Sequence, residues 1–447
     1  MRITHLAAGA ANMYCGACLR DAAMARALIA RGHDMQIVPL YTPLRLDGDA
    51  DIPVADVHLG AMNAYLQQVS GIFARLPRPL ARLLDHEGLL RFISRFAVST
   101  TPSELGPMTV SVLAGADGRQ HREVERLIDF LARDARPDVV TITNSMLSGV
   151  APRIKQSLGV PVLCEVKGED GFIEALPEPH RKEAIALARR NARSIDRFIA
   201  PTAQYADRMA AFLDVEREQI EIVRSIVDGR AFVRRAARHR EPFTVGYVSV
   251  ITPRKGLHVL VDALAQLVEQ GRDVRLRIAG QVLDRKYWRE IRRAIRRHGL
   301  SERVDVLGEI GFADKVALLH SLSAFCQPSI KPEALGTASL EAMAAAVPVV
   351  APSEGVFSET LEMTQGGLPF ESANAEMLAA RLTELMDAPG GADEMGESGA
   401  RGIAEHFSAD AAASALERIL SEATENTNVG GIDDGEEALQ AREEGQT

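Results

Sequence analysis

The stretch from Pro332 to Val350 constrains this chain more than any other, because it places two glutamates around the start of an expected helix. Leu340 to Ala346 is a run of strong helix formers, and Gly336 stands shortly before it. We therefore predict a helix that begins near Gly336 and ends before the proline that follows. Glu333 then lies in the loop outside the helix, and Glu341 lies about one turn inside it.

The first amide groups of this helix form the second part of the predicted site. A helix leaves its first N–H groups without intrahelical partners, and its dipole favours negative charge there, phosphate above all. The donors of Leu335 to Ala338 would face a ligand, and Glu341 would share a helix face with Thr337. Backbone donors for a diphosphate, beside carboxylates that accept from sugar hydroxyls, are the groups that an enzyme using a nucleotide sugar needs.

The same residues resemble the signature of a known family. The stretch is similar to the E-x7-E signature of family 4 glycosyltransferases of the GT-B fold, in which the motif usually reads like EGFGLVLLEAMACGxPVVA. The alternative is an amphipathic helix that only packs, with Glu341 on its solvated face. The positions that match in register are Glu333, Gly336, Glu341, Ala342, Met343, Ala344, Pro348, Val349, Val350 and Ala351.

The resemblance covers about residues 1 to 423 and implies an α/β protein of the GT-B class, with two Rossmann-like doubly wound domains facing a cleft. The first forty residues also predict an α/β fold, because a buried strand from Arg2 to Ala8, a helix from Ala22 to Ala30 and a second strand from Met35 to Tyr41 form a βαβ unit. The expected N-terminal domain, on the acceptor side, spans 1–228 with an insertion at about 45–110, and a linker follows at 229–242. The expected C-terminal domain, which binds the nucleotide sugar, spans 243–406. A closing helix at 407–423 is expected to return to the N-terminal domain, and an acidic disordered tail is expected at 424–447.

The resemblance also implies roles for individual residues. Glu341 would accept hydrogen bonds from the ribose of the donor. Glu333 and the amides of Leu335 and Gly336 would hold the donor sugar. Lys255 would neutralise the diphosphate as it departs.

The chain departs from the family pattern at two positions. Val250 stands where the family has an arginine that grips the diphosphate, and Arg254 is the neighbouring cation that would compensate. Lys167, also a candidate catalytic residue, stands where the family commonly has a histidine near the donor sugar. A lysine can bind phosphate or a carboxylated sugar, but it cannot act as a neutral imidazole does. Gly16 matches the family's loop after the first strand. Gly308 matches the position at which the family contacts the donor base.

The activity implied by the resemblance is transfer of a sugar, a hexose in our interpretation, from a nucleotide sugar such as a UDP- or GDP-sugar. The transfer would retain the anomeric configuration and use no metal and no other cofactor. The acceptor (a glycan, a lipid or a small molecule) and the oligomeric state are not indicated. The two departures motivate an alternative, a catalytically weak nucleotide-sugar-binding protein.

Cys15 and Cys18 form a Cys-Gly-Ala-Cys motif at the start of an expected helix, which is how a thioredoxin-type redox pair is built. A dithiol redox protein is therefore a further alternative, and a zinc site would need ligands from elsewhere, such as Cys164 or Cys326. A thioredoxin fold is small, whereas this motif belongs to a long doubly wound sheet. We favour a substrate loop lined by small residues.

Charge and hydropathy limit the partners. The net charge is −10, from 51 basic and 61 acidic residues, and the segment from Thr424 onward holds seven acids and one base. The tail thus carries −6 and the rest −4, which gives no support for nucleic-acid binding. No apolar run approaches the roughly 18 residues that span a bilayer, and four cysteines without a signal-peptide layout indicate the cytoplasm. Basic, apolar segments at about 67–98 are candidates for peripheral contact with the inner face of the membrane, although packing on the N-terminal domain is favoured.

Overall fold

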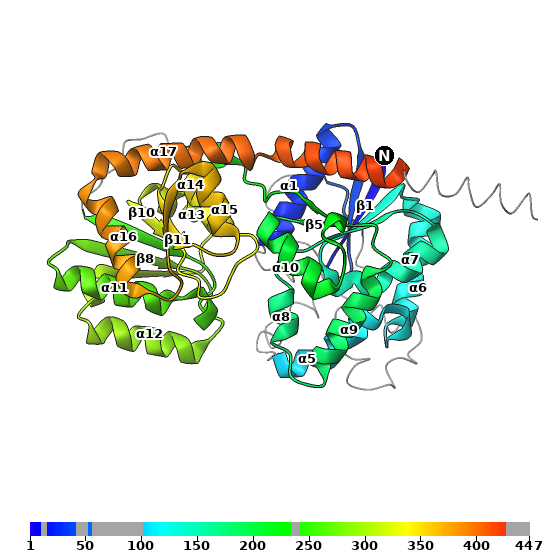
Figure 1. The fold of residues 1–447 in the computed structure, drawn as a ribbon, viewed down its shortest axis with the longest axis horizontal. Helices are drawn as coiled ribbons and strands as arrows, with labels where there is room; N and C mark the ends of the chain where they lie inside the picture. The colour runs from blue at the N-terminus through cyan, green and yellow to red at the C-terminus, as the bar shows by residue number, and fades with distance from the viewer. Residues whose placement is uncertain (10–15, 42–51, 56–101, 234–241, 426–447) are drawn as a thin grey trace, which may run out of the picture. The chain divides into compact units, whose positions relative to one another are not determined.

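The computed structural model describes residues 1–9, 16–41, 52–55, 102–233 and 242–425. The chain forms two compact units, one from Met1–Val223 with Ala412–Thr447 and the other from Arg224–Ala411. In the described ranges, each unit is built on a six-stranded parallel sheet with helices between successive strands (Figure 1). The predicted α/β class is therefore confirmed.

The first sheet has the strand order β2-β1-β3-β4-β5-β6, so the chain reverses its direction of travel across the sheet between β1 and β3. Ile3 pairs with Met35 on one side and with Val139 on the other, which fixes β1 in the middle of the sheet. The elements of this unit are β1 (Arg2–Ala7), α1 (Gly16–Ala30), β2 (Asp34–Pro39), α5 (Pro102–Ala114), α6 (His121–Phe130), β3 (Val139–Ile142), α7 (Ala151–Leu158), β4 (Val162–Glu165), α8 (Asp170–Glu174), α9 (His180–Ala192), β5 (Arg197–Ala200), α10 (Ala203–Leu213), β6 (Ile220–Ile222) and a helix at 409–425.

The second sheet has the order β12-β11-β10-β7-β8-β9, with its reversal between β7 and β10. Its elements are β7 (Phe243–Val248), a 3-10 turn η8 (Pro253–Lys255), α11 (Leu257–Glu269), β8 (Val274–Ala279), α12 (Arg285–Arg297), β9 (Val304–Gly308), α13 (Phe312–His320), β10 (Ala324–Cys326), α14 (Thr337–Ala344), β11 (Val349–Pro352), α15 (Val356–Thr364), β12 (Gly367–Phe370), α16 (Ala375–Asp387) and α17 (Pro389–His406).

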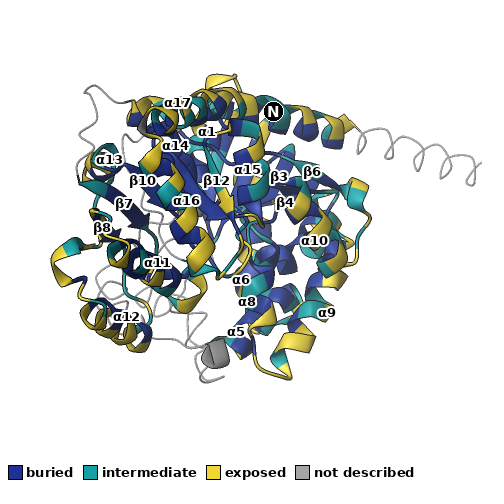
Figure 2. Ribbon diagram, turned by 60° about the vertical axis from the view of Figure 1, so that its left-hand side comes forward, coloured by how far each residue is buried: buried dark blue, intermediate teal, exposed yellow. Residues whose placement is uncertain are grey.

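The second sheet has a hydrophobic core on each face, because successive strand residues point to opposite sides. In β10, Ala324 and Cys326 pack with α11, α12 and α16, whereas Phe325 packs with α13, α14 and α15. The central strands β7, β10 and β11 are largely buried, the edge strand β9 is largely exposed, and the helices expose their outer sides (Figure 2). Since β10 and β11 are covered on both faces, their sequences are almost continuously apolar, whereas β8 and β9 near the edge also carry charged residues.

Several boundaries differ from the sequence-based expectations. We expected the first helix from Ala22, but α1 already begins at Gly16. The expected linker at 229–242 begins with a short 3-10 turn at Gly229–Phe232. The Phe232 side chain is buried in the core that contains Phe325, α13, α14 and α15. The expected tail start at Thr424 lies within the last helix, which runs to residue 425. Most of the insertion expected at about 45–110 lies outside the described residues.

Candidate donor site

The loops after β7 and β10 meet in the second unit. These two strands are neighbours at the point where the strand order reverses, and ligands of doubly wound sheets bind at the carboxyl ends of strands at such a point. The amide of Ile330 donates to the carbonyl oxygen of Arg254 over 3.0 Å. Gly256 has a φ of +70°, and a Cβ there would lie 1.7 Å from the carbonyl oxygen of Pro328. A glycine is therefore required where the two loops cross.

This crossing brings the predicted residues Lys255 and Glu333 together. The ammonium Nζ of Lys255 lies 2.8 Å from Oε1 of Glu333, and both side chains are partly exposed. Gln327 Nε2 also donates to Glu333 Oε1, over 3.1 Å, and the Ser329 hydroxyl donates to the same atom. Gln327 and Ser329 were not identified from the sequence. They orient the Glu333 carboxylate, which can still accept further hydrogen bonds.

The loop that carries Glu333 is fixed from β11 as well. The amide of Val356 donates to the carbonyl oxygen of Glu333 over 2.8 Å. Gly355 has a φ of +66°, and a Cβ there would meet the backbone N and O of Glu333 at 2.8 Å each. The loop after β11 therefore holds the backbone of Glu333, while Gln327 and Ser329 after β10 hold its carboxylate.

Helix α14 begins where the sequence predicted. Gly336 adopts a φ of +56°, a left-handed conformation that favours glycine, and Thr337 is the first helical residue. A Cβ on Gly336 would approach Val356 Cγ1 to 2.8 Å, so α14 packs closely on α15. The hydroxyl of Ser339 in the first turn is buried and has no hydrogen-bond partner among the residues that the structure describes. Such groups are uncommon in folded proteins.

Glu341 is buried on α14 and has an ion-pair partner that sequence reasoning missed. Lys315, on α13, places its Nζ 2.6 Å from Glu341 Oε1. Burial raises the pKa of Glu341, and Lys315 opposes this rise. The Lys315 ammonium also lies 5.4 Å from the centre of the Phe312 ring. No local pattern marks this lysine, because only the packing of α13 against α14 gives it a role.

The remaining predicted donor residues lie in this unit apart from Gly16. Val250 is 38% exposed just after β7, and Arg254 is exposed in the following turn. Leu335 precedes α14, and Gly308 ends β9 with a φ of +71°. Gly16 is the first residue of α1 in the other unit.

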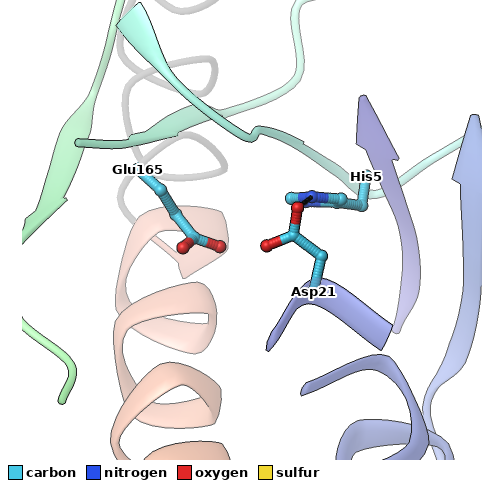
Figure 3. Close-up of side chains that lie close together, drawn as sticks. All are labelled: His5, Asp21 and Glu165. Atoms are coloured by element: carbon cyan, nitrogen blue, oxygen red, sulfur yellow. Dashed lines mark ion pairs between the residues drawn. The ribbon is translucent and has the colours of Figure 1, made fainter. Parts of the chain in front are cut away.

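Lys167 takes part in a buried charge network of the first unit. Its Nζ contacts Asp21 on α1 and lies 3.1 Å from Glu165 Oε2 at the end of β4. Arg20 pairs with Glu165 as well. His5 on β1 places Nε2 3.3 Å from Asp21 Oδ2 (Figure 3). In this structure the ammonium of Lys167 is thus already engaged by two carboxylates.

The charges of this network balance within the protein. Burial acts to raise the pKa of Asp21, but Lys167 and His5 outweigh it and hold that pKa well below its usual range. His5, Asp21 and Glu165 offer ligand atoms within 4.8 Å of one another, a spacing that a metal ion could use (Figure 3). A divalent ion would have to displace the cations that already pair with both carboxylates. We therefore interpret the cluster as a structural ion-pair network.

The cysteine motif remains an open prediction. Cys15 lies outside the described residues, and Cys18 lies in the first turn of α1. Of the two cysteines that were considered as additional zinc ligands, Cys164 is buried in β4 and Cys326 in β10, each in a different unit. Burial raises the pKa of both thiols, so neither is disposed to ionise.

Comparison with protein families gives a consistent result for both units. Residues 22–225 match the model of the glycosyl transferase 4-like domain, and residues 230–402 match the model of glycosyl transferases group 1. Two units with doubly wound parallel sheets, matched by these two family models, are typical of the GT-B fold. The chain belongs to the group 1 glycosyltransferase family, family 4.

Solved structures of similar fold cover nearly the whole chain. The HepE protein of Anabaena, crystallised with UDP and glucose, is 18% identical, with a TM-score of 0.65 over 94% of this chain and 99% of its own. The sucrose-phosphate synthase of Thermosynechococcus elongatus is 16% identical, with a TM-score of 0.71 over 94% of this chain and 98% of its own. At such identities the likeness supports the fold, and it confirms the expected GT-B class.

Curated relatives match over shorter stretches. The phosphatidyl-myo-inositol mannosyltransferase of Mycobacterium leprae is 35% identical over 30% of this chain and 34% of its own length. The glycogen synthase of Mycobacterium tuberculosis is 23% identical over 64% of this chain and 69% of its own length. The chain thus spans about a third of the first relative and about two thirds of the second.

Within the described ranges, no helix combines the length and the apolar character needed to cross a bilayer. The segments at about 67–98, which were considered for peripheral membrane contact, lie outside the described residues.

Proposed function

We propose that this protein transfers a hexose from a nucleotide sugar to an acceptor, with retention of the anomeric configuration and without a metal ion. The observation that carries the proposal is the pairing of Lys255 with Glu333 at the reversal of the second sheet, beside the start of α14. A cation, a carboxylate and free helix amides at one point match a ligand with a diphosphate and sugar hydroxyls. Membership of the group 1 glycosyltransferase family supports the same function.

Different residues contact different parts of the donor. Lys255 and the amides of Leu335 and Gly336 face the diphosphate and its sugar, and Lys255 neutralises charge as the bond from the sugar to the phosphate breaks. Glu333 accepts from the sugar hydroxyls, and its orientation by Gln327 and Ser329 supports this role. The departing phosphate takes the proton of the acceptor hydroxyl, so this scheme uses no protein base.

The ribose is assigned to Glu341. Lys315 occupies one acceptor position of its carboxylate, which has about four, so ribose hydroxyls can bind without breaking the ion pair. The donor base is expected to be uracil or guanine. HepE was crystallised with UDP-glucose, and a related enzyme of Corynebacterium glutamicum is named as a GDP-mannose-dependent mannosyltransferase.

A thermal-shift screen with UDP, GDP, ADP and dTDP, followed by the corresponding sugars, tests the donor site. A ligand at 100 times its dissociation constant stabilises by about 2.7 kcal/mol, which gives a clear shift of the melting temperature. We expect one nucleoside diphosphate to stabilise the parent and to lose most of its effect in the Glu341→Ala variant. The assignment fails if none of the four stabilises the parent.

A catalytically weak binding protein is the second candidate. It is favoured by the engagement of Lys167 in ion pairs and by the valine at position 250. Incubation of the chain with the stabilising sugar nucleotide distinguishes the two, because an enzyme releases nucleoside diphosphate by transfer or by slow hydrolysis. Release that does not exceed the rate of a Lys255→Ala, Glu333→Ala double variant would identify a binding protein.

A further inference from the structure

Helix α12 carries an unusual concentration of positive charge. Seven of its thirteen residues are basic and one, Glu290, is acidic, so the helix has a net charge of +6 in a chain of net charge −10. All seven basic residues are exposed, and Figure 2 shows α12 largely in the colour of exposed residues. We call these residues the α12 stripe: Arg285, Lys286, Arg289, Arg292, Arg293, Arg296 and Arg297.

The stripe lies on one side of the helix. With about 100° per residue, the seven positions fall within an arc of about 140°, and the buried residues occupy the opposite side. Those buried residues are Tyr287, Ile291, Ala294 and Ile295, and they pack in the core shared with α11. From the first to the last basic residue the stripe extends about 18 Å along the helix. The cations therefore form an outward-facing band along the helix and do not converge on one point.

The residues that the structure describes do not neutralise the stripe. None of its side chains forms an ion pair with any residue that the structure describes, whereas other arginines of the same unit do. Arg272 pairs with Asp387, and Arg303 pairs with Asp273. Like charges one helical turn apart destabilise a helix, so a row of them that has no counter-charge is costly for the isolated protein. An external partner of opposite charge would remove that cost.

We propose that the α12 stripe docks this protein on an anionic lipid surface. A flat array of phosphates fits an outward-facing band of guanidinium and ammonium groups, and such contacts add up over several basic residues. Because the apolar side of α12 is used in the core, the helix does not insert, and the attachment is electrostatic and reversible. Leu283, 51% exposed just before the helix, is an apolar contact for the interface.

Nucleic acid fits the stripe less well. Proteins that bind single strands stack bases on exposed aromatic side chains. On α12, Tyr287 is buried and its hydroxyl contacts His258 Nδ1 at 2.8 Å, and Trp288 is partly buried against the core. The α12 stripe contains no residue of the 67–98 segments, and the proposal does not depend on the proposed function.

Co-sedimentation of the full chain with vesicles tests the proposal. The vesicles contain phosphatidylcholine alone or phosphatidylcholine with anionic phosphatidylglycerol. We expect binding to the anionic vesicles only, and its loss in about 0.5 M NaCl because salt screens the contacts. The Arg289→Glu, Arg292→Glu, Arg296→Glu triple variant should lower the partition coefficient at least about 100-fold.

The control variant carries the same change of charge at scattered sites. Arg26→Glu, Arg275→Glu and Arg401→Glu alter three exposed arginines on three different elements, and this triple variant should keep most of the vesicle binding. Circular dichroism and thermal melting establish that both variants are folded. Equal loss of binding in the two folded variants would overturn the proposal, because net charge alone would then explain the attachment.

Two further outcomes would also overturn it. Tighter binding to single-stranded or duplex DNA oligonucleotides than to anionic vesicles would assign the stripe to a nucleic acid. Vesicle binding that appears only after the acidic residues of 433–444 are replaced by their amides would show that the chain's own tail occupies the stripe. We expect the parent protein to bind anionic vesicles more tightly than DNA, and to bind them with its acidic tail unchanged.

Discussion

Replacing Glu341 by alanine should weaken the binding of the nucleoside diphosphate that stabilises the parent. A hydrogen bond to a charged group contributes about 1.5 to 3 kcal/mol, which corresponds to a dissociation constant about 10 to 150 times higher. The structure supports the full range because Glu341 is buried and Lys315 leaves part of its acceptor capacity available. Isothermal titration calorimetry measures the change directly.

Two further variants separate binding from stability. Glu341→Gln keeps an acceptor oxygen but removes the charge, so its affinity should lie between those of the parent and the alanine variant. Glu341→Ala also leaves the largely buried ammonium of Lys315 without its partner, which should lower the melting temperature. Adding Lys315→Met to Glu341→Ala should restore much of the lost melting temperature, because the unpaired charge is then removed.

Equal nucleotide affinity in the parent and in a folded Glu341→Ala variant would refute this reasoning. Glu341 would then serve only to pair with Lys315 and join α13 to α14. A second refuting result is full recovery of nucleotide affinity in the Glu341→Ala, Lys315→Met double variant. The affinity loss would in that case come from the unpaired lysine and not from a missing ribose contact.

Three other outcomes follow from the structure. In a nucleotide-release assay, Lys255→Ala should reduce turnover far more than Arg254→Ala, because only Lys255 contacts Glu333; the reverse order would assign the diphosphate to Arg254. The Cys15→Ser, Cys18→Ser double variant should keep turnover within a few-fold of the parent in reducing buffer, and loss of activity with loss of a bound metal would contradict this. Asp21→Asn should lower the free energy of unfolding by about 3 kcal/mol at neutral pH, measured by urea denaturation. Since the pKa of Asp21 is depressed by folding, its stabilisation is present above the unfolded value of about 4 and is lost as the pH falls through the lower folded value, so parent and variant should converge in acid.

The sequence was most informative where the physical cause is local. The start of α14 was predicted because glycine favours the left-handed conformation before a helix and the following residues favour the helix itself. The βαβ order was predicted from buried apolar runs that alternate with helical segments. The position of Glu333 in a loop and of Glu341 inside the helix followed from these two local features.

The start of α1 shows a limit of prediction from the local sequence. We expected this helix from Ala22 to Ala30, and the residues before it include Gly16 and Cys18, which are weak helix formers. In the structure α1 begins at Gly16, and Asp21 in that early part pairs with Lys167 from the loop after β4. Tertiary contacts override propensity at this point.

What the sequence determined by itself is therefore the class of fold, the family and the segment that carries the two glutamates. Only the tertiary structure decided which cation each carboxylate meets. Lys315 pairs with Glu341, Lys255 with Glu333, and Lys167 is engaged by Asp21, which is 146 positions away in the chain. The physical reason is that these pairs depend on which strands and helices become neighbours, and strand order is set by the packing of whole units, which no local pattern of residues encodes.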